Sequence, residues 1–220
     1  MSKGSKRQIE PVKDNMDKYL TYRSHATVYK IALEKKFYFE AITIAYAMLE
    51  DRLFSFYYHI GAISRRYCKV SGIDTPHVEE VINAILKDCV GKEKYKRNTS
   101  EKAGERFIRL DQIGNKIQVL RALLICAKEE KQLFPDDPYY QSLMEILSKG
   151  DVKEMLRTVD KILKWNEYRN EVVHALFVKS MESLLDKLPE MAEIGIKYAQ
   201  AIDNLSNRAK TEGIRKQLGL

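Results

Sequence analysis

Apolar side chains recur every three or four residues along nearly the whole chain, from about residue 16 to its end. This spacing gathers apolar groups on one side of an α-helix, and the alternation typical of strands is nearly absent. Only short segments rich in glycine, proline and small polar residues interrupt the pattern. We therefore expect an all-α helical bundle of about seven or eight helices. The expected helices span residues 16–35, 37–68, 76–90, 105–134, 138–149, 151–165, 169–188 and 189–209.

A chain of 220 residues can form one domain with its own core. We expect this domain at residues 16–209, with accessory helices, between a disordered basic arm at 1–15 and a basic tail at 210–220. The amino-terminal segment lacks the apolar stretch of a secretory signal, and no apolar run is long enough to cross a bilayer. Three widely spaced cysteines indicate no disulfide framework. We therefore expect a cytoplasmic protein that is not associated with a membrane.

The expected helix at 37–68 is apolar almost all round, which is typical of a central, buried helix. One stripe of it is expected to face the core: Ile42, Ala45, Leu49, Leu53, Phe56 and Ile60. Glu40 and Glu50 lie on another face of the same helix. An unpaired buried carboxylate is costly, so each must either meet a basic group or point to solvent at the edge of the helix.

The net charge is +7, and the basic residues are unevenly placed. Residues 91–109 hold seven Lys or Arg against three Glu. A basic surface suits nucleic acid because each phosphate that it neutralises releases counterions. The candidate RNA-binding residues are Lys92, Lys94, Lys96, Arg97 and Lys102. The alternative is a loop whose charges only keep the protein in solution.

No cysteine pair has metal-ligand spacing, and the chain has neither a glycine-rich phosphate loop nor an HExxH sequence. We therefore expect no metal and no other cofactor.

A polar group stands out in the segment WNEYRNEVVHALF, where Arg169 and Asn170 precede His174 at the expected start of a helix. Asn170 and His174 are one helical turn apart and can lie side by side. Arg169 is about 140° away from His174 around an ideal helix. Two arrangements remain open. Either Arg169 lies in a non-helical first turn and reaches back, or it meets the histidine of a second copy across a two-fold axis.

This trio has the chemistry for cutting RNA. Histidine changes protonation near neutral pH, so it can move a proton to or from a ribose 2′-hydroxyl or a leaving 5′-oxygen. Arginine presents a fork of donors that stabilises the charge of a phosphorane-like transition state. Arg169 and His174 are therefore candidate catalytic residues, and Asn170 can orient either group. Arg52 and His59 have a comparable spacing, but their neighbours are aromatic, and we interpret this second pair as incidental.

The sequence RNEVVH resembles the Arg-x(4–6)-His motif of HEPN domains. It lies late in a helical chain, after a long buried helix that carries the acidic segment LEDRL, and this order is similar to that family's layout. The resemblance covers roughly residues 37–188. It implies a dimeric, metal-independent endoribonuclease with a composite site between two copies. It further implies a toxin or phage-defence effector, with an antitoxin or another defence component as partner. Glu40, Glu50 and Asp51 are the candidate supporting acids.

One position departs from part of that family. Some members carry a tyrosine two residues after the histidine, which a nucleotidyltransferase partner modifies, whereas this chain has Leu176 there. Two other functions remain open. One is a non-catalytic helical module that binds RNA or protein through residues 91–109, and the other is a structural subunit in which His174 only packs.

Overall fold

The computed structural model describes residues 15–63, 75–102, 105–175 and 185–219. These segments are mostly helical, which confirms the all-α prediction apart from one short hairpin. The elements are α1 (Asn15–Glu34), α2 (Tyr38–His59), α3 (Pro76–Cys89), α4 (Lys92–Asn98), β1 (Thr99–Lys102), β2 (Glu105–Ile108), α5 (Ile113–Lys128), α6 (Pro138–Ser148), α7 (Val152–Ala175), α9 (Leu188–Glu212) and α10 (Ile214–Gln217).

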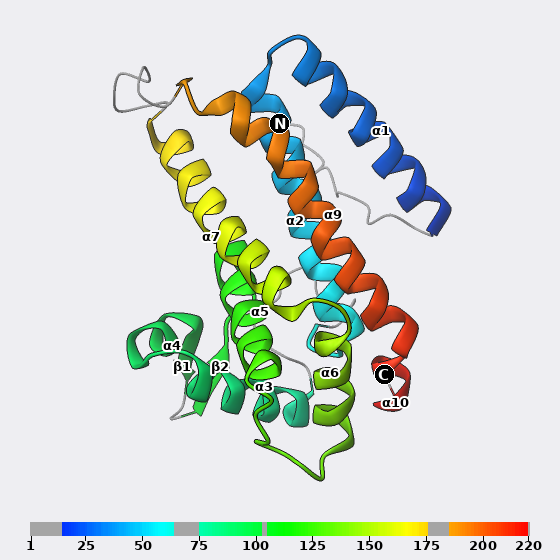
Figure 1. The fold of residues 1–220 in the computed structure, drawn as a ribbon, viewed down its shortest axis with the longest axis vertical. Helices are drawn as coiled ribbons and strands as arrows, with labels where there is room; N and C mark the ends of the chain where they lie inside the picture. Colours follow the sequence, from blue (N-terminus) through cyan, green and yellow to red (C-terminus); the bar gives the residue numbers. More distant parts are fainter. Residues whose placement is uncertain (1–14, 64–74, 103–104, 176–184, 220) are drawn as a thin grey trace, which may run out of the picture.

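Helices α2 and α9 run side by side along most of their length (Figure 1). The whole expected core stripe of α2 is buried, from Ile42 to Ile60. Gly195 lets the two helices approach closely, because a Cβ there would lie 2.7 Å from the Ala45 side chain and 3.0 Å from that of Trp165. The Trp165 indole donates a hydrogen bond to the Met191 carbonyl at 3.0 Å, which ties α7 to the same place.

Helix α2 ends earlier than the periodicity predicted. Ile60 follows its last turn, and Gly61 then adopts a left-handed backbone with φ of 79°. A left-handed residue just after a helix is the common way to end one, and glycine adopts it without strain. The rest of the expected helix, residues 64–68, lies outside the described residues.

The helix expected at 105–134 begins only at Ile113, so this prediction was wrong at its start. An antiparallel hairpin precedes it and pairs Thr99 with Ile108. The local pattern has period two, since Ile108 and Leu110 are buried on either side of the more exposed Arg109. The hairpin also joins α3, because the Ile108 amide donates to a Glu79 carboxylate oxygen at 2.8 Å. The apolar face expected for the following helix, including Ile117 and Leu120, is buried.

The two helices expected at 151–165 and 169–188 are continuous through their junction, so the break predicted there was wrong. The junction contains no glycine or proline, and Trp165 and Asn166 are both buried in it. Asp151 caps the start of α7, with its carboxylate accepting from the Glu154 amide at 2.9 Å. Residues 176–184 of the expected second helix lie outside the described residues.

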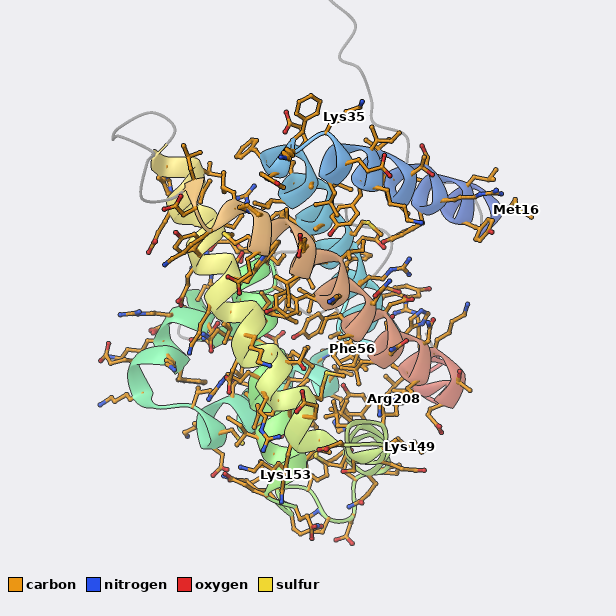
Figure 2. All side chains as sticks on the ribbon, turned by 45° about the horizontal axis from the view of Figure 1, so that its top comes forward. Met16, Lys35, Phe56, Lys149, Lys153 and Arg208 are labelled. Carbon is orange, nitrogen blue, oxygen red and sulfur yellow. The ribbon has the colours of Figure 1, made fainter. Side chains whose placement is uncertain are left out.

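Helices lie at both ends of the described chain. The arm at 1–14 lies outside the described residues, and α1 begins at Asn15. The expected tail at 210–220 instead continues α9 and then forms α10, in which Ile214 is buried. Figure 2 shows Met16 and Lys35 near opposite ends of α1, with Lys149 and Arg208 at the other side of the molecule. Within the described residues, no helix is long and apolar enough to cross a membrane.

Candidate functional site on helix α7

Helix α7 carries the three residues that the sequence singles out, and its buried face fixes their direction. The side chains that it turns inward are Val159, Ile162, Trp165, Asn166 and Val172. Val172 is buried and Val173 is only half-buried, so the unbroken helix turns the first of these two valines inward.

Arg169 lies over α2. Its guanidinium carbon is 4.0 Å from the centre of the Tyr46 ring, which is the geometry of a cation–π contact. A guanidinium nitrogen also contacts the Asn170 side-chain oxygen at 3.3 Å. Both partners are neutral. Among the described residues, no carboxylate forms an ion pair with Arg169, so its positive charge is held in place without being cancelled.

Glu50 meets a basic group, as predicted. Its carboxylate is 3.3 Å from the Lys116 ammonium, whose side chain is only 6% exposed while that of Glu50 is 42% exposed. Lys116 lies in the first turn of α5, and the Tyr57 hydroxyl of α2 donates to its carbonyl. The ion pair therefore joins α2 to α5 one helical turn after Tyr46, the residue on which Arg169 stacks.

The ring of Tyr46 connects these two pairs. Burial raises the pKa of its hydroxyl, and the negative charge of Glu50 raises it further, whereas the positive charge of Arg169 lowers it. Both charges therefore act on one ring. Of the three candidate supporting acids, Glu50 is the one that shares a neighbour with Arg169.

The other two acids are placed differently. Glu40 is exposed in the first turn of α2. Asp51 accepts a hydrogen bond from the Tyr22 hydroxyl and so joins α1 to α2.

Asn170 and His174 are both exposed, one turn apart near the end of α7. Because α7 is continuous from Val152 to Ala175, Arg169 is fully helical and does not reach back from a first turn. That arrangement of the site was wrong. The structure brings Arg169 and Asn170 together, and it turns His174 to another side of the same helix.

Sequence reasoning missed three neighbours of the trio. Tyr46 lies one turn before Glu50 on α2, and this spacing was visible in the chain. Lys116 is distant in sequence and could not be assigned without the fold. Asn166 is 5% exposed, its side-chain oxygen has no donor among the described residues, and its amide nitrogen faces Gly114 of α5.

The basic candidates form a second region around α4, well below the end of α7 in Figure 1. Lys92, Lys94, Lys96 and Arg97 are all exposed on that short helix. Lys102 ends β1, and its side chain lies outside the described part of the chain. In the described residues, no group of three or more acidic, cysteine or histidine side chains could hold a metal ion.

Comparisons of the chain with protein-family models, with curated proteins and with solved structures gave no match.

Proposed function

We propose that this chain is a metal-independent endoribonuclease of the HEPN type, working as a homodimer and serving as a toxin or phage-defence effector. The observation that carries the proposal is the state of Arg169. Its guanidinium is held on Tyr46 and Asn170, and within the described residues no carboxylate forms an ion pair with it. A fixed and uncancelled guanidinium suits a phosphodiester, because it can offer parallel donors to two phosphate oxygens.

The reaction follows from the groups present. His174 accepts the proton of the ribose 2′-hydroxyl, whose oxygen attacks the neighbouring phosphorus. The bond from phosphorus to the 5′-oxygen breaks, and that oxygen takes up a proton from a protonated imidazole. The products are a 2′,3′-cyclic phosphate and a free 5′-hydroxyl. Arg169 stabilises the charge that develops on the phosphorus oxygens, and Asn170 orients the guanidinium.

Because α7 is continuous, it determines how far apart Arg169 and His174 point within one protomer. Within one protomer, Arg169 and His174 point about 140° apart, so one phosphate does not bridge them easily. A second copy related by a two-fold axis can supply the missing side chain from its own α7. We therefore place the reaction between Arg169 of one protomer and His174 of its partner.

Mixed dimers test this arrangement directly. The Arg169→Ala and His174→Ala variants are each expected to lose at least about 100-fold in cleavage rate. When the two inactive variants are refolded together, one composite site regains both wild-type side chains, and activity is expected to return. Labelled RNA, separated by gel after multiple turnovers, gives the readout.

The controls separate the alternatives. If the mixture stays inactive while mass spectrometry shows mixed dimers, the composite site is rejected. If His174→Ala alone cuts RNA at the wild-type rate, the ribonuclease proposal itself is rejected. Cleavage is expected to persist in excess chelator, and its loss there would contradict a metal-independent reaction.

The exposed basic residues of α4 favour a second function, a module that binds RNA without cutting it. This function predicts salt-dependent RNA binding that weakens when Lys94, Lys96 and Arg97 are neutralised together. It also predicts that no product forms at any protein concentration. The same gel therefore decides between the two functions.

A further inference from the structure

Two cysteines that are distant in sequence lie in the same neighbourhood around Lys131. Cys89 is the last residue of α3, and Cys126 lies inside α5. Both are free thiols; the Lys131 amide donates to the Cys126 carbonyl at 3.2 Å, and the Lys131 ammonium binds Asp88, the residue before Cys89. Cys126 is fully buried, whereas Cys89 is half-buried at the edge of the pair. The fold thus places one dithiol between two packed helices.

Polar groups surround the pair. The Cys126 sulfur is 3.3 Å from the Tyr140 hydroxyl oxygen of α6. The Cys89 sulfur is 3.9 Å from the carboxylate of the adjacent Asp88. The Lys131 ammonium binds that same carboxylate, so a positive charge lies close to both sulfurs.

These contacts shift the pKa values of the two thiols in opposite directions. The hydrogen bond from Cys89 lowers the pKa of Cys126, and the Lys131 charge lowers it further, although burial opposes both. The same bond raises the pKa of Cys89, and burial and the charge on Cys126 add to that rise. The pair therefore ionises at Cys126, and Cys89 keeps its proton. A thiolate in contact with a second thiol is the arrangement of a redox-sensitive dithiol.

We propose that Cys89 and Cys126 form a reversible disulfide when a hydroperoxide oxidises them. With hydrogen peroxide, the Cys126 thiolate attacks one oxygen and the O–O bond breaks. Hydroxide leaves and takes up the proton that Cys126 had lost, which gives water and a sulfenic acid on Cys126. The Cys89 sulfur then attacks the Cys126 sulfur, and the S–O bond breaks. A second water leaves with the Cys89 proton, so the two thiols have given two electrons to one peroxide.

The disulfide has a defined structural effect. It closes the part of the chain between residues 89 and 126, which contains α4, both strands and most of α5. Cross-linking a loop of this size removes conformational freedom mainly from the unfolded chain, so oxidation stabilises the fold. Oxidant thus acts on the segment that carries the exposed basic helix, whatever the activity of α7.

Peptide mapping of the full chain under non-reducing conditions tests the proposal. The protein is treated with hydrogen peroxide, both as wild type and as Cys68→Ser, so that the third cysteine does not exchange with the pair. We expect one cross-linked peptide that joins Cys89 to Cys126 in both proteins. We also expect a higher melting temperature after oxidation, which returns to its starting value with dithiothreitol.

Two further variants test the role of the nearby charge. Lys131→Met removes the ammonium beside the sulfurs and is expected to slow oxidation several-fold. Lys128→Met, an exposed neighbour on α5, is the matched control and is expected to leave the rate unchanged. The proposal is overturned by a sulfinic acid on Cys126 without any cross-link, by disulfides only between separate chains, or by equal oxidation rates in the two lysine variants.

Discussion

Two arginines of this chain stack on tyrosines, and the rest of their surroundings differ. The Arg52 guanidinium lies 3.7 Å from the centre of the Tyr22 ring and 2.7 Å from the Asp203 carboxylate of α9. Arg169 lies 4.0 Å from the centre of the Tyr46 ring and has Asn170 as its other partner. A carboxylate thus pairs with the Arg52 guanidinium, whereas in the described part of the chain none pairs with that of Arg169.

The two arginines also belong to the two Arg–His pairs of the sequence. Arg52 and His59 are two helical turns apart and share a face of α2, whereas Arg169 and His174 diverge. Spacing alone would therefore favour the first pair for a site within one protomer. The contacts favour the second pair, because Arg52 is occupied in holding α1 and α9 to α2. The comparison teaches that the partners of a motif residue carry more information than its spacing.

The sharpest way to break this comparison is to remove each arginine and measure cleavage. Arg169→Ala is expected to reduce the rate at least about 100-fold, because no other described cation replaces its guanidinium. Arg52→Ala is expected to leave the rate per folded molecule within about threefold. Arg157→Ala, an exposed change on α7 itself, serves as the control. A large loss in Arg52→Ala at full folding would reverse our assignment of the two pairs.

Urea unfolding should rank the same two arginines in the opposite order. Arg52→Ala is expected to lower the free energy of unfolding by about 2 kcal/mol, because it leaves the Asp203 carboxylate without its partner in a half-buried place. Arg169→Ala is expected to cost about 1 kcal/mol or less, the usual size of a cation–π contact. Equal losses in the two variants would show that Arg169 is also a structural clamp.

A smaller effect is expected at the ring beneath Arg169. Tyr46→Leu keeps an apolar surface but removes the cation–π contact, so the guanidinium is held less firmly. We expect a decrease of roughly two- to fivefold in cleavage rate with little change in RNA affinity. The matched change Tyr22→Leu beneath Arg52 should affect stability instead. An unchanged rate in Tyr46→Leu would mean that the ring does not position Arg169.

The smallest expected effect is the pH dependence at Tyr22. Burial raises the pKa of its hydroxyl, and the negative charge of Asp51 raises it further. A raised pKa in the fold contributes stability that is complete below the unfolded value, about 10, and is lost as pH rises above it. Unfolding at pH of about 8 and 11 should therefore show the gap between wild type and Tyr22→Phe narrowing. Tyr19→Phe, at an exposed position, should show no such change, and a constant gap for Tyr22→Phe would contradict this account.

The helices and their core stripes could be predicted because helical periodicity is local. The stripe of α2, the buried face of α5 and the cap at Asp151 all follow from residues near one another in sequence. The break predicted in α7 was wrong although no glycine or proline interrupts the junction, and the contact of Trp165 with the Met191 carbonyl of α9 could not be read from the local sequence. The hairpin was missed because its alternating pattern is short and interrupted by charged residues.

The candidate site divides in the same way. The sequence singled out Arg169, Asn170 and His174 as candidates, and it gave a basic partner as one of two placements for Glu50. It could not name Lys116 as that partner or place Tyr46 under Arg169, because both contacts join different helices. The proximity of Cys89 and Cys126 could not be predicted either, because they lie on different helices. Whether two protomers meet at α7 stays a prediction.

Gly195 has a consequence for recognising distant relatives of this chain. Because Ala45 and Trp165 leave no space for a side chain there, a methyl group at 195 needs compensation from one of them. A change at 195 in evolution must therefore be accompanied by a change at 45 or at 165. A helical protein in which the residues equivalent to 45, 165 and 195 covary in size would share this junction, even if little else in its sequence remained alike.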